Sequence, residues 1–208
     1  PDYPGFGQSS APDASEYDYD FAALAQTMDG FVQALDLSDY TLYMQDYGGP
    51  VGLRLAHEHP ERVSGLIIQN ATLHFEGWNP DIVNQFLPFW TNRNSETEKP
   101  LRQFLTAQTT EWQYRQGSTV SERLNPDAWV SDQAGLDRPG NTAIQLEYLW
   151  NYQDNIASYE AWQSQLADTQ PDTLIVWGQN DPFFTMDGVN ALQALLPDAK
   201  THLYDAGH

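Results

Sequence analysis

An aspartate followed by a tyrosine and two glycines occupies residues 46–49, and this short stretch is the part of the chain best suited to chemistry. Residues 40–44 before it are typical of a strand, and residues 50–57 after it have helical spacing. A tight strand-to-helix turn exposes the side chain at its tip, and glycines let the turn pass close to neighbouring backbone. A carboxylate held there can attack the sp3 carbon of an epoxide or carbon–halogen bond without first losing a proton. Asp46 is therefore a candidate nucleophile, the alternative being an ordinary aspartate in a loop.

Two residues that could complete this chemistry follow predicted strands near the end of the chain. Asp181 comes after a predicted buried strand over residues 172–178, and His208 comes after a short predicted strand over residues 200–204. Nucleophile, acid and histidine in this order, with the last two each just beyond a strand, is the order found in α/β-hydrolases. Together the three positions indicate a catalytic triad more strongly than any one of them does.

The chain resembles the α/β-hydrolase superfamily, and within it the branch with an aspartate nucleophile, which contains epoxide hydrolases and haloalkane dehalogenases. Residues 45–49 (QDYGG) resemble the Q-D-W-G-G elbow of that branch, with Tyr47 in place of the tryptophan. Residues 177–181 (WGQND) resemble its W-G-x-x-D acid loop, and residues 207–208 its Gly-His pair. Residues 1–9 resemble the D-x-x-G-x-G-x-S turn that follows the fourth strand.

The resemblance implies a two-step hydrolysis of a small apolar electrophile by water. Asp46 would form a covalent alkyl ester, and His208 would then activate the water that hydrolyses it, while Asp181 holds the histidine. The backbone N–H of Tyr47 would donate a hydrogen bond to the oxyanion of the second step. No cofactor is implied. No H-x-x-x-H or H-E-x-x-H pattern occurs, so no metal site is predicted.

Three readings of the reaction remain open from the sequence. Opening of an epoxide is the first, because Tyr148 and Tyr152 lie one helical turn apart, roughly where epoxide hydrolases carry a proton-donating tyrosine. Dehalogenation is the second: Trp90 could donate to a halide, and Gln45 matches the dehalogenase elbow, although Tyr47 does not. The third is a binding protein of the same fold with vestigial catalysis.

Alternating predicted strands and helices indicate an α/β-hydrolase fold, a mostly parallel sheet flanked by helices. Residues 1–70 and 169–208 are predicted to form its two core parts, and residues 71–168 an inserted helical cap. This middle segment is rich in Gln, Asn and aromatic residues and is too long for a simple loop. Further elements are predicted at residues 21–35 (helix), 63–70 (strand), 101–115 (helix), 142–155 (helix) and 186–196 (helix).

Compared with the family, the chain starts at the end of the fourth strand and stops at His208, before the last helix. We therefore expect the sequence to be truncated at both ends, with its N-terminal strands missing. Missing strands would leave an open sheet edge, which is a liability for pairing and aggregation.

The composition of the chain is strongly acidic. Asp and Glu number 29 against 9 Lys and Arg, giving a net charge of -20 that would repel nucleic acid and anionic membranes. Such surfaces are typical of halophiles, because salt shrinks the Debye length to ~3 Å at 1 M and so relieves the repulsion between like charges. The alternative is an acidic protein from an organism that lives at ordinary salt concentration. The absence of Cys, of a long apolar run and of a signal-peptide pattern predicts a soluble cytoplasmic protein.

Overall fold

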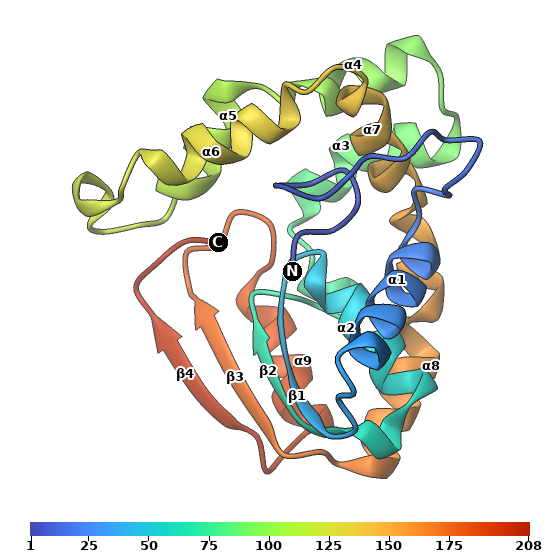
Figure 1. Cartoon of the computed structure of the whole chain (residues 1–208). Coiled ribbons are helices and arrows are strands. Elements are labelled where there is room, and N and C mark those ends of the chain that lie inside the picture. The colour runs from blue at the N-terminus through green and yellow to red at the C-terminus, as the bar shows by residue number, and fades with distance from the viewer.

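The computed structural model describes residues 1 to 208, and at its centre is a four-stranded parallel sheet with the strand order β1-β2-β3-β4 (Figure 1). Parallel neighbours cannot be joined by a tight hairpin, so a helical crossover follows each strand before the next one begins. This arrangement confirms the parallel α/β architecture expected from the sequence. The strands are β1 (Tyr40–Gln45), β2 (Val63–Gln69), β3 (Thr173–Gly178) and β4 (Lys200–Tyr204).

A layer of helices covers one side of the sheet, where α1, α2, α8 and α9 contact one another in turn (Figure 1). The strand register places Met44 beside Ile68 and Ile68 beside Ile175, and all three side chains are buried. Because side chains alternate along a strand, this row of apolar residues forms one face, against which α2 packs at Gly52. The elements of this layer are α1 (Phe21–Ala34), α2 (Gly48–Glu58), the 3-10 turn η1 (Pro60–Arg62), α8 (Gln153–Thr169) and α9 (Met186–Leu195).

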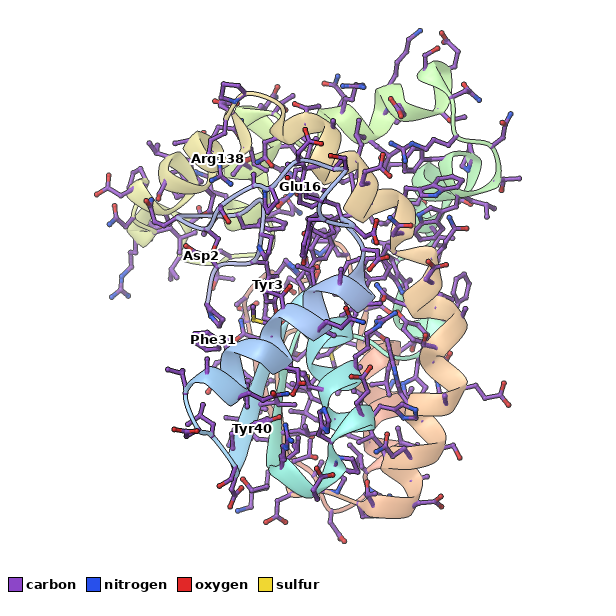
Figure 2. The ribbon with its side chains drawn as sticks, turned by 45° about the vertical axis from the view of Figure 1, so that its right-hand side comes forward. Asp2, Tyr3, Glu16, Phe31, Tyr40 and Arg138 are labelled. Carbon is purple, nitrogen blue, oxygen red and sulfur yellow. The ribbon has the colours of Figure 1, made fainter.

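The opposite side of the sheet is less covered. Tyr43 follows the alternation away from Met44 and is 61% exposed, and its hydroxyl donates a hydrogen bond to the side chain of Gln69. On the helical side, at the edge of the sheet, an apolar groove of about 240 Å³ lies between α1 and β1, and its lining includes Phe31 and Tyr40 (Figure 2). The edge strand β1 is therefore bordered by a partly exposed apolar surface.

A helical segment connects β2 to β3 and lies over the carboxyl ends of the strands (Figure 1). Its helices share one core with the sheet, since Leu101 and Leu146 belong to the same buried cluster as Trp177 of β3. None of the helices in the chain combines the length and the apolar character needed to cross a bilayer. Before α8, the segment consists of η2 (Phe75–Gly77), α3 (Pro80–Thr91), α4 (Ser95–Gln103), α5 (Ala107–Arg115), η3 (Ser121–Arg123), α6 (Asp127–Leu136) and α7 (Asn141–Asn151).

Two single helices predicted in this segment are wrong, because each is broken. The helix expected over residues 101–115 is interrupted after α4, where Thr106 has an extended backbone with φ −91° and ψ 149°. The helix expected over residues 142–155 is divided at Tyr152, whose carbonyl accepts the N–H of Asn155 in a tighter turn than an α-helix makes. The second break lies at a residue whose side chain enters the main cavity.

Candidate active site

The backbone of Asp46 is held in the left-handed region, with φ +45°, on the turn between β1 and α2. Such a conformation costs a residue other than glycine ~1–3 kcal/mol and persists only where the surroundings fix it. Here the N–H of Gly49 donates to the Asp46 carbonyl at 2.9 Å. A Cβ at Gly49 would lie 2.9 Å from the Cβ of Ala71, so the turn is packed tightly against the end of β2. The turn therefore presents the Asp46 side chain, 39% exposed, to a cavity.

The three residues predicted as a triad come together in space. His208 Nδ1 lies 2.7 Å from Asp181 Oδ2, and His208 Nε2 lies 3.0 Å from Asp46 Oδ2. The Asp181 side chain is fully buried and that of His208 is 9% exposed. The imidazole thus bridges two carboxylates, one buried behind it and one open to the cavity.

The Asp181 carboxylate accepts hydrogen bonds from four donors. Its Oδ1 accepts the backbone N–H groups of Phe183 at 2.6 Å and Phe184 at 3.1 Å. Its Oδ2 accepts Nδ2–H of Asn70 at 2.6 Å in addition to the histidine. Four donors fix the carboxylate rigidly and keep it suited to accept the N–H of His208.

Asn70 is a site residue that the sequence analysis did not identify. It follows β2 with φ +40° and is buried, and its Oδ1 accepts the N–H of Gly178 at 2.9 Å. Asn70 therefore binds both the Asp181 carboxylate and the end of β3, the strand before the loop of Asp181. A signal was present, because carboxyl ends of neighbouring parallel strands meet at one edge and Asn70 ends the strand beside the one before Asp181.

The electrostatics of the site keep His208 charged. Burial by itself lowers the pKa of an imidazole, but hydrogen bonds to Asp181 and Asp46 and the charges of the two carboxylates outweigh it and raise the pKa of His208 to about 10. The side-chain amide of Gln45, the residue before the elbow aspartate, lies 2.9 Å from His208 Nε2. Gln45 and Asp46 therefore meet the same imidazole nitrogen.

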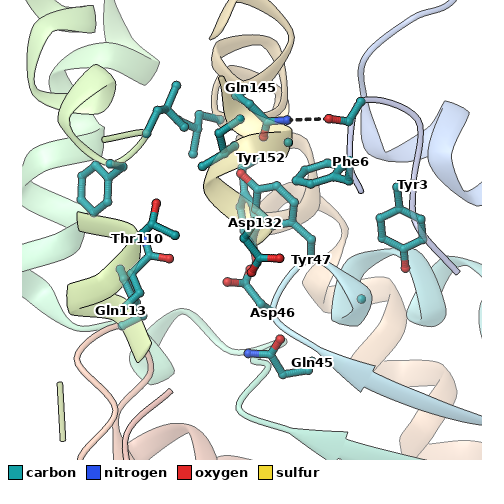
Figure 3. Close-up of a pocket in the computed structure, with 18 of the residues that line it drawn as sticks. Tyr3, Phe6, Gln45, Asp46, Tyr47, Thr110, Gln113, Asp132, Gln145 and Tyr152 are labelled. Carbon is teal, nitrogen blue, oxygen red and sulfur yellow. Dashed lines mark hydrogen bonds between the residues drawn. The ribbon is translucent and has the colours of Figure 1, made fainter. Parts of the chain in front are cut away.

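The cavity in front of Asp46 has a volume of about 630 Å³ and is lined by apolar, aromatic and acidic residues. Figure 3 shows Asp46 facing it from the end of β1, while Gln145 and Tyr152 approach from the helical segment. Asp2 and Asp132 add two further carboxylates, and the lining contains no Lys, Arg or His. A largely apolar pocket with few polar groups suits a small uncharged molecule.

Tyr152 is the only one of the three predicted leaving-group contacts that lines this cavity. Its buried hydroxyl has no hydrogen-bond partner, and its pKa is raised well above the ordinary value by burial, by neighbouring Tyr159 and by the charge of Asp46. A phenol in this state keeps its proton, and because neighbouring atoms cover the hydroxyl, a ligand reaches it only after they move.

The other two predicted contacts lie elsewhere. Tyr148 donates its hydroxyl proton to the carbonyl of Pro4 at 2.9 Å, and the Nε1–H of Trp90 donates to the carbonyl of Leu149 at 2.8 Å. Both donors are used within the protein, and neither residue lines the cavity. The expectation that these side chains contact a leaving group is therefore corrected: aromatic packing between helices explains them.

Tyr47 contributes to the site by its backbone and its side chain. Tyr47 is the capping residue just before α2, and its backbone N–H donates to no backbone carbonyl. This N–H is therefore free to donate to an oxyanion beside Asp46. The phenol of Tyr47 lines the cavity. Burial, and then the charge of Asp46, raise the pKa of this phenol, which therefore stays protonated. No cluster of three or more His, Asp or Glu side chains is arranged to hold a metal ion.

Sequence comparisons agree with this geometry. A family model described as alpha/beta hydrolase fold matches residues 1–208. A protein of Saccharomyces cerevisiae described as an uncharacterized hydrolase is 33% identical over 211 residues, covering 100% of this chain and 72% of the yeast protein. A haloalkane dehalogenase of Psychrobacter cryohalolentis is 42% identical over a shorter stretch of 73 residues, or 35% of this chain and 24% of that enzyme.

Solved structures share the fold at low sequence identity. A mutant of the haloalkane dehalogenase DatA from Agrobacterium tumefaciens has a TM-score of 0.75 at 21% identity, covering 99% of this chain and 71% of that one. Wild-type Cfl2 from Burkholderia cenocepacia has a TM-score of 0.76 at 18% identity, covering 100% of this chain and 71% of that one.

A parallel sheet with a strand-to-helix turn that faces a histidine held by a carboxylate is typical of the class of α/β-hydrolases. The match of the family model along all of residues 1–208 assigns the chain to the same class. The chain belongs to the alpha/beta hydrolase fold family and is a hydrolase of that family.

Proposed function

We propose that this protein opens small apolar epoxides to diols through a covalent ester on Asp46. The observation that carries the proposal is that Tyr152, whose buried hydroxyl has no hydrogen-bond partner, lines the same cavity as Asp46. An epoxide needs a nucleophile at carbon and a proton at oxygen, and Asp46 with Tyr152 supplies both. In the same proposal, residues 71–168 act as a cap over the core formed by residues 1–70 and 169–208.

The first step joins one Asp46 carboxylate oxygen to a ring carbon. The bond between that carbon and the ring oxygen breaks, and the oxygen takes the proton of Tyr152. The products are a hydroxyalkyl ester on Asp46 and a phenolate at Tyr152. This step needs no base, because a carboxylate is already a nucleophile.

Ester formation then converts His208 into a base. The charge and hydrogen bond of Asp46 are among the causes that raise the pKa of His208 to about 10, and the ester removes that charge. The pKa of His208 therefore falls, and its proton passes through solvent to the Tyr152 phenolate.

The second step regenerates the enzyme. His208 takes a proton from water, whose oxygen adds to the ester carbonyl while the Tyr47 N–H stabilises the oxyanion. The bond between the carbonyl carbon and the alkyl oxygen breaks, and the departing oxygen takes the proton back from His208. The diol leaves, and the carboxylic acid formed at Asp46 passes its proton to His208. Asp46 is then again a carboxylate and His208 again an imidazolium.

The test uses a His208→Gln variant, which should carry out the first step but not the second. Incubation with short epoxides should add the whole mass of the epoxide to the protein, on a peptide containing Asp46. The matched control is His208→Gln combined with Asp46→Asn, which should gain no mass. An adduct on the control, or full turnover by the single variant, would overturn the assignment of Asp46 and His208.

Dehalogenation is the second candidate, favoured by the 42% identity to a haloalkane dehalogenase over 73 residues. The phenols of Tyr47 and Tyr152 both line the cavity and could donate to a departing halide. The same His208→Gln variant distinguishes the two reactions, because a haloalkane leaves only its alkyl group on Asp46. Adding Tyr152→Phe should slow adduct formation from epoxides, which need its proton, more than formation from haloalkanes.

A further inference from the structure

A loop of the helical segment lies directly on the loop that carries His208. Residues 116–119, between α5 and η3, contact residues 205–208, and Figure 1 shows the end of the chain beneath the helical segment. The Thr119 hydroxyl donates to the carbonyl of Asp205 at 3.1 Å. This contact lies outside the triad and takes no part in the bond-making steps of the proposed reaction.

Two glycines allow the loops to approach this closely. Gly117 has φ +79°, and a Cβ built on it would clash with the carbonyl oxygen of Asn180 and lie 2.8 Å from the Cα of Gly207. Gly207 in turn has no room for a Cβ, because the carbonyl of Gln116 occupies that space. Gly207 immediately precedes His208, so a displacement of this contact moves the histidine.

Asn180 joins the two loops to the acid loop. Its Nδ2 donates to the carbonyl of Gly117 at 2.9 Å and to Oδ1 of Asp205 at 2.8 Å. Its backbone N–H donates to the carbonyl of Ala206 at 2.9 Å. Asn180 precedes Asp181, so one side chain connects the helical segment to the loops of both the acid and the histidine.

We infer that residues 116–119 are a positioning element that holds His208 in the position needed for hydrolysis of the ester. Gly117 and Asn180 are its positioning residues. The inference rests on the proposed function. Ester formation by Asp46 requires no base, whereas ester hydrolysis requires His208 to reach a water. A small displacement of the histidine therefore slows the second step selectively. Since α5 also lines the cavity through Gln113, the same element couples the cavity wall to the base.

The experiment compares Gly117→Ala with Gly140→Ala. Gly140 is a matched control in the same segment: its φ is +83°, but a Cβ there meets nothing within 4 Å. Both substitutions introduce the same strain of a left-handed alanine, and only Gly117→Ala disturbs the loops that carry Asp181 and His208. Rapid mixing with an epoxide, followed by intact-mass measurement over time, gives the rates of ester formation and ester hydrolysis separately.

Gly117→Ala should slow ester hydrolysis by ~10-fold or more, since small misplacements of catalytic groups can cost up to ~100-fold, and the ester should accumulate. Ester formation should change by less than ~2-fold by the same reasoning, because Asp46 does not move. Gly140→Ala should leave both rates unchanged. If Gly117→Ala does not fold, Thr119→Val provides the same test, because it removes one exposed hydrogen bond to Asp205.

Three outcomes are distinguishable. Selective slowing of ester hydrolysis in Gly117→Ala or Thr119→Val supports the inference. Equal rates in Gly117→Ala and Gly140→Ala, or equal slowing of both steps, overturn it while leaving the triad in place. Absence of any adduct in all variants, including His208→Gln, instead overturns the proposed function on which it rests.

Discussion

At the scale of single residues, His208 links the chemistry of the site to the stability of the fold. Its pKa is raised from 6.5 to about 10 because Asp181 and Asp46 stabilise the imidazolium more than burial destabilises it. A raised pKa means that the folded protein holds this proton more tightly than the unfolded chain does. The resulting stabilisation is fully present below about pH 6.5 and is lost as the pH rises through about 10.

The free energy of unfolding should therefore decrease between pH 6.5 and pH 10 by an amount that depends on His208. Denaturant unfolding of the natural protein and of His208→Gln at several pH values measures it. The difference between the two proteins should shrink as the pH rises, because glutamine does not titrate. A difference that stays constant over this range would show that the two carboxylates do not hold a proton on the imidazole.

At the scale of elements, two glycines in helices differ in what surrounds them. Gly30 in α1 is exposed, and a Cβ there would meet nothing, so Gly30→Ala should stabilise the protein by ~1 kcal/mol through helix propensity. Gly52 in α2 packs on β1, where a Cβ would lie 2.7 Å from Cγ of Met44. Gly52→Ala should therefore destabilise by ~1–3 kcal/mol, since overpacking exceeds the gain in propensity. Thermal unfolding of both variants tests this contrast, which disappears if α2 can move away from the sheet.

Elements of the sheet and of its helical layer could be predicted because local pattern and tertiary structure agree there. The strands over residues 40–44 and 200–204 and the helix over residues 186–196 lie within one or two residues of the observed bounds. The breaks at Thr106 and Tyr152 could not be predicted, because packing of the helical segment overrides a continuous helical pattern. Propensity is only a weak guide where tertiary contacts decide.

The site shows the same division. The motifs named Asp46, Asp181 and His208 because each follows a strand, and parallel strands bring their carboxyl ends to one edge. The roles of Asn70 and of Gly117 depend on contacts between segments far apart in the chain, such as the bond from Asn180 to Gly117. No local pattern carries that information. Trp90 and Tyr148 were named by position alone, and packing of the helices directs their polar groups elsewhere.

At the scale of the whole molecule, charge should select the substrate. The net charge is -20, and the cavity adds Asp2 and Asp132 to the carboxylate of Asp46 without a lining Lys, Arg or His. An epoxide that bears a carboxylate should therefore have a kcat/KM at least ~10-fold below that of an uncharged epoxide of the same size. Raising the salt from 0.1 M to 1 M should narrow the gap by screening. Comparable rates for both substrates at low salt would contradict this account of the cavity.

The contacts that hold Asp181 have a consequence in time as well as in space. The hydrogen bonds to the Asp181 carboxylate are complete only when Asn70, 111 residues away in sequence, and His208 have both reached it. His208 must also reach Asp46, which lies 162 residues away in sequence. Contacts between such distant segments form late in folding, after local helices. A refolding chain therefore regains its helices before it regains its triad. Recovery of the reaction reports the last stage of assembly, at which these distant segments come together.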